Sequence, residues 1–446
     1  MFSFVRSPKA RARRAGSHLA LALALVSAGG IGAVALEAPA HAQKKNEEEA
    51  PKANYSKGFV EVYQPLAARI QAKEDPAALK AALPAMTAAA ETDDDKFVAG
   101  QATYSVGLAA KDLPLQRQGI EMMLDSGKVP AEQQGLNLFA AGQLAFQAED
   151  WAAARSRFEQ AIAAGYNDPN AQGLLAESYF SEENYAAGLA SLKQAIDAQA
   201  AAGAPIDESW IQRGFAVSYN NQLANQAAQF AELYVTHFPS SDVWGDAIAV
   251  QRSFYDYDDH AMLDILRLAD RTDSLRSERD YVDYISVADA RRLPGEVGRI
   301  VNEGLAANLL RSSDVLVAEA KSTAEAQSGP AREDLPELER DARASAGGAL
   351  AASAAGDMYL NFGNAAKAAE MYELALTKSD VDTARVLTRL GIAQVDLGQF
   401  AEAKATFGRI QGPRAPIANL WSIYADAQAS GGTTATTTAA ADTPAQ

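Results

Sequence analysis

Small and apolar side chains recur along this chain at a spacing of 34 residues. Each position of one copy keeps the size class of the other, so that small residues match small ones and aromatic residues match aromatic or aliphatic ones. The first copy has Gly142, Trp151, Ala154, Phe158, Ala161 and Ile162, and the second has Ala176, Tyr185, Gly188, Leu192, Ala195 and Ile196. A repeat of this length corresponds to one helix-turn-helix unit, which buries its apolar face only by stacking on its neighbours. The pattern therefore predicts a stacked array of helical hairpins.

The pattern returns near the C-terminus at a spacing of 35 residues. The earlier copy has Gly356, Gly363, Ala368, Tyr372 and Ala375, and the later copy has Gly391, Gly398, Ala403, Phe407 and Ile410. Small residues let two helices approach closely, and the aromatic residue fills the space to the next hairpin. Four units fit the pattern: 135–168, 169–202, 349–383 and 384–411. A fifth unit at 208–239 is degenerate, because Ala231 stands where an aromatic residue is expected.

These residues resemble the tetratricopeptide repeat, and the chain is similar to an exported bacterial member of that family. The segment from Leu390 through Gly398 to Phe407 is close to the family consensus. The resemblance implies an all-α fold, a right-handed superhelical array of helix-turn-helix hairpins that is called an α-solenoid. An ordinary helical bundle with chance spacing of Ala and Gly is the alternative. No stretch alternates apolar and polar residues as strands do, so we expect no sheet.

The N-terminus has the features of a signal peptide. Basic residues lie within 6–14, an uncharged apolar stretch runs over 19–36, and Ala40-His41-Ala42 offers a small-x-small cleavage site. We therefore expect cleavage after Ala42, export to the periplasm and no stable membrane span after cleavage. The chain has no Cys, so it is not a lipoprotein, because lipidation needs a thiol at the cleavage site.

Composition and turn residues divide the rest of the chain. The predicted segments are the signal peptide (1–42), a disordered leader (43–54), a divergent N-terminal helical region (55–130), tetratricopeptide repeats (131–240), divergent helical hairpins (241–345) with a hinge at 321–336, C-terminal repeats with a capping helix (346–429) and a disordered tail (430–446). Four helices are expected in the N-terminal helical region, separated by Asp75-Pro76, Thr92-Asp93 and Leu113-Pro114.

The net charge of −17 limits the classes of partner. Removal of the basic signal peptide would make the chain still more acidic. Like charges repel, so we expect no binding to nucleic acid or to an anionic membrane surface. A protein or peptide is the expected partner, and a basic one is favoured by the charge.

Residues suited to catalysis or metal binding are few. The predicted mature chain has two histidines, His237 and His260, and no thiol, which leaves little material for nucleophilic triads or Cys/His metal sites. The segment 256–260 gathers three carboxylates and an imidazole, but it lacks the further oxygen ligands and the Gly of a calcium loop. Its simpler interpretation is a loop in which Asp258 or Asp259 caps the following helix.

We therefore predict that the chain is not an enzyme and that it uses no metal and no cofactor. The alternative is an enzyme or enzyme subunit with a site in the atypical region 241–345.

The resemblance places a partner groove on the first helix of each hairpin, which lines the concave face in the tetratricopeptide family. The aromatic residues at the corresponding positions are Phe146, Phe180 and Tyr219, and the polar residues beside them are Gln143, Gln147, Glu177, Gln212 and Asn220. Such a groove suits an extended peptide or a partner helix. It implies a periplasmic interaction scaffold in envelope assembly, secretion or polysaccharide export. The alternative is that the aromatic residues pack between hairpins as core.

Overall fold

The computed structural model describes residues 53–344 and 348–431, and the described residues from Tyr55 onward belong to one compact unit. The predicted signal peptide at 1–42, residues 43–52 of the leader and residues 432–446 of the tail lie outside the described residues. Every regular element in the described ranges is a helix, and none is a strand. The predicted all-α fold, an α-solenoid of helical hairpins, is confirmed.

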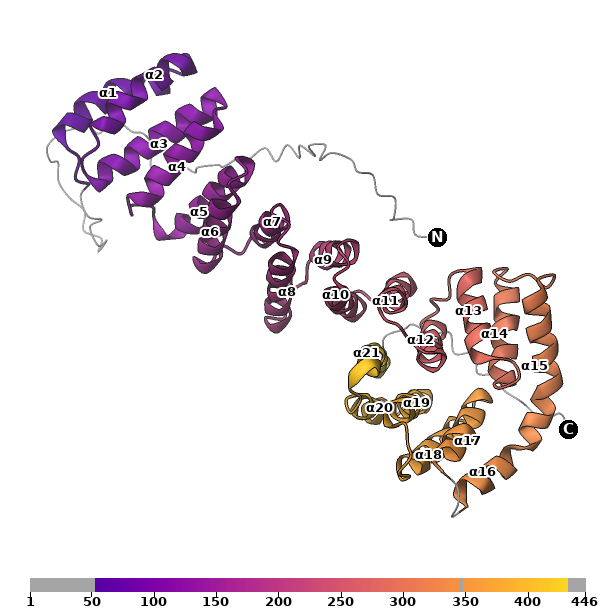
Figure 1. The fold of residues 1–446 in the computed structure, drawn as a ribbon. Coiled ribbons are helices and arrows are strands. Elements are labelled where there is room, and N and C mark those ends of the chain that lie inside the picture. Colours follow the sequence, from indigo (N-terminus) through magenta and orange to yellow (C-terminus); the bar gives the residue numbers. More distant parts are fainter. Residues whose placement is uncertain (1–52, 345–347, 432–446) are drawn as a thin grey trace. The chain divides into compact units, whose positions relative to one another are not determined.

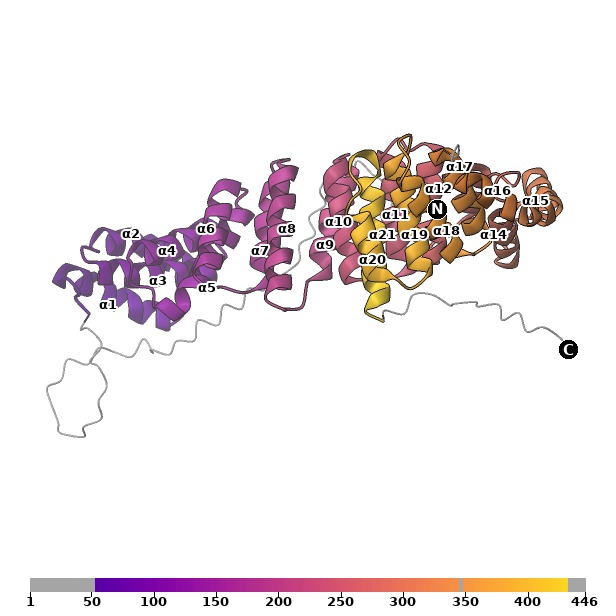
Figure 2. The same ribbon diagram turned by 90° about the horizontal axis from the view of Figure 1, so that it is seen from below.

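The helices follow one another in short-looped pairs (Figures 1 and 2). The first ten are α1 (Lys57–Gln71), α2 (Pro76–Ala88), α3 (Asp93–Ala110), α4 (Leu113–Asp125), α5 (Ala131–Gln147), α6 (Trp151–Ala163), α7 (Pro169–Phe180), α8 (Tyr185–Ala201), α9 (Glu208–Asn220) and α10 (Ala224–His237). The others are α11 (Ser241–Phe254), α12 (Asp259–Arg271), α13 (Glu278–Ala288), α14 (Pro294–Ala306), α15 (Val315–Glu333), α16 (Leu335–Arg343), α17 (Ala349–Asn361), α18 (Ala365–Leu376), α19 (Thr383–Asp396), α20 (Phe400–Phe407), the 3-10 helix η1 (Gly412–Arg414) and α21 (Ala415–Ala429).

The four helices expected in the N-terminal region are present as α1 to α4, and they begin where the sequence indicates. Thr92 caps α3 by accepting a hydrogen bond from the backbone N–H of Asp95, and the Asp95 carboxylate accepts one from the N–H of Thr92 in return. Asp95 also accepts a hydrogen bond from the N–H of Ser56, at the start of α1. Burial alone would raise the pKa of Asp95, but these hydrogen bonds outweigh it and lower that pKa.

The small residues of the repeat lie against aromatic rings. A Cβ atom added at Gly142 would lie 2.6 Å from the ring of Phe158, and one added at Gly391 would lie 2.3 Å from the ring of Phe407. Both rings are buried. Since real Cβ atoms essentially never approach another heavy atom within 3.0 Å, a larger residue at either position would force the two helices of the hairpin apart.

The degenerate fifth unit obeys the same rule in a different register. A Cβ atom added at Gly214 of α9 would lie 2.1 Å from the ring of Phe230 in α10, and this ring is fully buried. The prediction that Ala231 stands at the aromatic position is therefore wrong by one residue. Helix α8 has 17 residues where α6 has 13, so Phe230 follows Leu192 of the preceding unit by 38 residues and not by 34.

The C-terminal hairpins return to the middle of the chain. Helix α21 was expected to cover the last repeat, and it does pack on α20. It also packs on α10 and α12, while α19 packs on α12 and α17 packs on α14 (Figure 1). Trp421 of α21 is fully buried, with its ring centroid 6.2 Å from that of Phe407. Helices α10 to α21, here called the closed part, therefore close on themselves.

The segment 321–336, predicted as a hinge, is helical over most of its length. Pro330 lies inside α15, and the break falls at Asp334, which ends α15 and precedes α16. Pro336 stands in the first turn of α16, where its missing N–H costs no hydrogen bond. Among the helices of the described ranges, none combines the length and the apolar character needed to cross a membrane.

Candidate functional site

The three aromatic residues of the predicted groove all pack against other rings or helices. Phe180 of α7 is only 7% exposed and belongs to the core. Phe146 of α5 is half-buried and meets the edge of Trp151, with ring centroids 4.9 Å apart. Tyr219 of α9 is half-buried against Phe254, with centroids 5.4 Å apart. The core alternative is therefore correct for Phe180, whereas Phe146 and Tyr219 keep part of their rings at the surface.

The polar residues predicted beside these rings differ in exposure. Gln147, Gln212 and Asn220 are exposed, Glu177 is half-exposed, and Gln143 is buried. The Oε1 atom of Gln143 has no hydrogen-bond partner among the described residues. Gln143 therefore contributes to the packed face of α5 and not to a surface that a partner could reach.

Arg213 of α9 brings two of the predicted residues together on α7. Its guanidinium forms two hydrogen bonds with the Glu177 carboxylate, at 2.5 and 2.8 Å, and lies 5.3 Å from the centroid of the Phe180 ring. On the same helix Gln212 donates a hydrogen bond to the hydroxyl of Tyr234 at 2.9 Å. The surface of α7 and α9 is thus a polar one, ordered by side chains of neighbouring hairpins.

The acidic segment 256–260 has the structural role that was expected of it. Asp258 caps α12, because its carboxylate accepts a hydrogen bond of 2.7 Å from the backbone N–H of Ala261. Within residues 53–344 and 348–431, no group of three or more His, Cys, Asp or Glu side chains is placed to hold a metal ion. His260 belongs instead to a network of buried charges.

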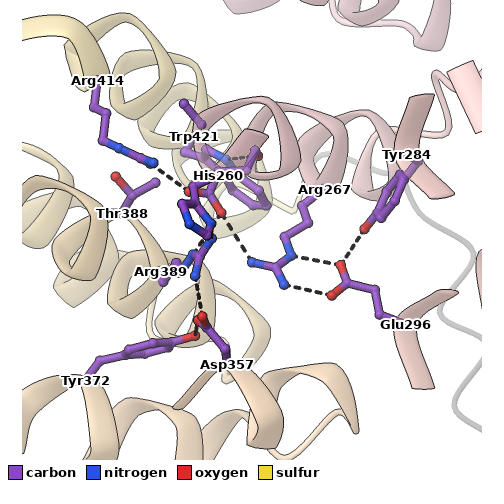
Figure 3. Close-up of polar contacts among 12 residues, drawn as sticks. His260, Arg267, Tyr284, Glu296, Asp357, Tyr372, Thr388, Arg389, Arg414 and Trp421 are labelled. Carbon is purple, nitrogen blue, oxygen red and sulfur yellow. Dashed lines mark hydrogen bonds and ion pairs between the residues drawn. The ribbon is translucent and has the colours of Figure 1, made fainter. Parts of the chain in front are cut away.

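Asp264 of α12 lies at the centre of this network and is fully buried. Its carboxylate faces three guanidinium groups from three segments: Arg267 at 3.2 Å, Arg389 of α19 at 3.3 Å and Arg414 of η1 at 2.7 Å. Figure 3 shows these arginines converging on one point between the helices. The indole N–H of Trp421 donates to the backbone carbonyl of Asp264 at 3.0 Å. One residue of α12 therefore holds α19, η1 and α21.

Two further carboxylates complete the network. Arg267 donates to both oxygens of Glu296 in α14, at 2.8 and 2.7 Å, and the Tyr284 hydroxyl donates to the same carboxylate at 2.6 Å (Figure 3). Arg389 also pairs with Asp357 of α17. Three carboxylates therefore balance three guanidinium groups inside the closed part, where an unpaired charge would be costly.

The backbone also joins this network. The N–H of Glu296 donates to the side-chain oxygen of Asn361 at 2.8 Å, which links the start of α14 to the end of α17. The Tyr372 hydroxyl donates to Asp357 at 2.7 Å. The second bond holds the Asp357 carboxylate that pairs with Arg389.

The guanidinium groups keep the carboxylates ionised. Burial alone would raise the pKa of Glu296, but the charge and hydrogen bonds of Arg267 outweigh it and lower the pKa to about 2. The pKa of Asp264 is lowered in the same way, against burial, by Arg389, Arg414 and Arg267. The site is therefore a group of buried ion pairs that hold the helices of the closed part together.

One feature of the sequence indicates this network, although it is not among the predicted site residues. Asp264 and Arg267 stand inside an otherwise apolar run of α12, with Leu263, Ile265 and Leu266 around them. A charge pair within such a run indicates burial with partners elsewhere in the fold. The identity of those partners could not be read from the run itself.

Comparisons with known proteins identify no family for this chain. No protein-family profile and no curated protein sequence matches the chain. Among solved structures, the complex of the TPR2AB domain of yeast Sti1 with pHSP90 is similar at 11% identity and a TM-score of 0.23, over 68% of this chain and 94% of that one. Naa15/Naa10 bound to HypK-THB is similar at 14% identity and a TM-score of 0.26, over 81% of this chain and 65% of that one. The function is therefore argued from the residues of this chain.

Proposed function

We propose that this protein is an exported, non-enzymatic interaction scaffold that binds a protein or peptide on the first-helix faces of α5, α7 and α9. The observation that carries the proposal is the exposure of Gln147, Gln212 and Asn220 at the predicted groove positions. Helices α5 to α9 pack on helices one or two positions away along the chain. An open hairpin array of this kind presents a continuous face on which amide side chains can bind an extended backbone or a helix.

Charge and the N-terminal pattern support the class of partner and the compartment. The net charge of −17 favours a partner with a basic surface, because complementary charge speeds encounter and disfavours acidic competitors. The basic stretch, the apolar stretch and Ala40-His41-Ala42 favour export to the periplasm. We place the scaffold in envelope assembly, secretion or polysaccharide export.

The test is site-specific photo-cross-linking in intact cells. A photoreactive residue replaces Gln147, Gln212 or Asn220 one at a time, and matched controls place it at Glu159 of α6 and Asn225 of α10, which are also exposed. We expect the same partner adduct from the groove positions and none from the controls. Equal adducts from all positions, or none from the groove positions, would refute the groove.

The compartment is tested separately on the same cells. Osmotic shock should release the protein with the periplasmic fraction, and N-terminal sequencing should begin at Gln43. Retention in the cytoplasm with an intact Met1 would contradict the proposed export without touching the groove.

A further inference from the structure

Helix α21 lies against α10 and α12, the second helices of two consecutive hairpins (Figures 1 and 2). Asn419 of α21 donates a hydrogen bond of 3.2 Å to the Glu232 carboxylate of α10. Trp421, which is fully buried, donates to the backbone carbonyl of Asp264 in α12. The row of second helices is therefore a surface on which a further helix can pack.

This row continues to α8, where it forms an open groove. Helix α8 is the second helix of the preceding hairpin, and the groove between α8 and α10 has a volume of about 370 Å³. No helix of residues 53–344 and 348–431 fills it. Helix α10 borders both places, because its Gln226 and Gln229 line the groove while its Glu232 is bonded to α21. The groove is thus continuous with the surface that α21 covers.

The groove has the dimensions and the floor that a helix needs. Its lining residues on α8 recur every three or four positions from Ala186 to Asp197, so it follows one face of α8 for about 16 Å, or three turns. Leu189 is only 1% exposed and forms an apolar floor. Ala186 and Ala190 are exposed, and such small side chains let another helix approach closely.

The groove is locally neutral, although the chain as a whole is acidic. Its two charged residues, Lys193 and Asp197, form an ion pair with each other at 2.5 Å. The other polar side chains that line it are the amides of Gln194, Gln226 and Gln229. Amides donate and accept hydrogen bonds without carrying charge. The groove therefore suits a partner surface that is apolar and uncharged.

We propose that the groove between α8 and α10 binds an amphipathic helix of a partner protein, which turns an uncharged stripe of aliphatic and small residues toward Leu189. The partner helix extends the packing that α21 begins on the same row of second helices. This surface is distinct from the first-helix faces of α5, α7 and α9, and it stands whether or not those faces bind a partner.

The test is site-specific photo-cross-linking of the full chain in intact cells. A photoreactive residue replaces Ala186 or Gln194, which lie about 12 Å apart along α8. Controls place it at Ala198 of α8 and Asn225 of α10, which are exposed on the same helices and do not line the groove. Mass spectrometry then identifies the linked residues of the partner.

We expect both groove positions to label one segment of one partner, at residues about eight positions apart, because a helix covers 12 Å in about eight residues. An extended peptide covers the same distance in about four residues. The spacing of the linked residues, and not capture itself, decides. A spacing of about four, no adduct from the groove positions, or equal adducts from the controls overturns the proposal.

A blocking variant tests the groove with a synthetic peptide of the linked segment. In A190W the indole occupies the groove, so we expect the dissociation constant to rise by at least about tenfold, whereas A198W should bind like the parent. Circular dichroism checks the fold of each variant, and if A190W does not fold, Q229W blocks the groove from α10 and decides.

Parent-like binding by a folded blocking variant overturns the site. The dissociation constant for the parent should also change less than about threefold between about 0.05 and 0.5 M NaCl, because the contact carries no net charge. A steep loss of affinity with salt would show that charged groups carry the binding and would overturn the uncharged stripe.

Discussion

At the scale of single residues, four hairpins share one contact between their two helices. A glycine of the first helix lies against an aromatic ring that follows sixteen residues later in the second. The pairs are Gly142–Phe158, Gly214–Phe230, Gly356–Tyr372 and Gly391–Phe407. Because glycine has no Cβ, the ring occupies the space where a side chain would stand. The contact therefore sets the distance between the helices of a hairpin.

Replacement of Phe230 with Ala should destabilise the protein, although the fifth unit was the least regular in sequence. The loss of a fully buried ring leaves a cavity and should cost about 3–5 kcal/mol of unfolding free energy. Thermal unfolding followed by circular dichroism measures the effect. Asn225→Ala, an exposed change in the same helix, is the control. A melting temperature equal to that of the parent would mean that Phe230 does not fill this position.

At the scale of elements, α12 is the helix that the C-terminal hairpins depend on. Its Asp264 meets arginines of α19 and η1, and its Arg267 meets Glu296 of α14. A buried ion pair is weak support when compared with an apolar pair, but the loss of one partner leaves the others charged and unsatisfied. Such a network therefore adds little net stability to the fold, but the substitution of one of its members is strongly destabilising.

The Asp264→Asn variant should lose about 3–5 kcal/mol of unfolding free energy, because three guanidinium groups then share no carboxylate at their centre. Urea unfolding followed by tryptophan fluorescence measures the loss, since buried Trp421 donates to the backbone of the same residue. Asp197→Asn breaks an exposed pair with Lys193 and should cost no more than about 0.5 kcal/mol. Equal losses in the two variants would refute a structural role for the network.

Whether a contact could be predicted depends on how far apart its two residues lie in the sequence. Hairpins such as α5–α6 and α19–α20 were predictable because glycine and ring lie within one unit and leave a local pattern. The groove residues followed from the same register, but the burial of Phe180 depends on how α7 and α8 pack. The Asp264–Arg389 pair joins residues 125 positions apart. No local pattern encodes such a pair, so the packing of α17, α19 and α21 against α10, α12 and α14 could not be predicted.

At the scale of the whole molecule, the described chain combines two modes of packing. Helices α5 to α9 pack on near neighbours in sequence, as the units of an open array do. Helices α10 to α21 are held in addition by contacts of α17, α19 and α21 with α10, α12 and α14. Stability should therefore be spread unevenly, with the closed part opening as one cooperative unit.

Hydrogen exchange should reveal this difference and its dependence on acid. At neutral pH, amides of α12 and α19 should exchange more slowly than those of α5 to α8. The pKa of Glu296 is about 2 in the folded chain, below its ordinary value of 4.5. A carboxylate with a lowered folded pKa stabilises the fold fully above 4.5, and this contribution is lost as pH falls toward 2.

The excess protection of α12 and α19 should therefore shrink over that pH range. In Glu296→Gln, whose side chain cannot ionise, the excess protection should already be smaller at neutral pH, and it should change less as the pH falls. Exchange that is uniform along the chain at neutral pH would contradict the closed part, and an excess that persists unchanged at pH 2 would contradict the role of the carboxylates.

The return of α21 to α10 and α12 also limits how the length of this protein can change in evolution. An open array can gain or lose a whole hairpin, because each unit needs only a neighbour of the same kind. Between α10 and α21 an added or deleted hairpin would move Arg389 and Arg414 away from Asp264 and leave buried charges without partners. Relatives of this chain should therefore differ in the number of hairpins before α10 and agree in the number after it.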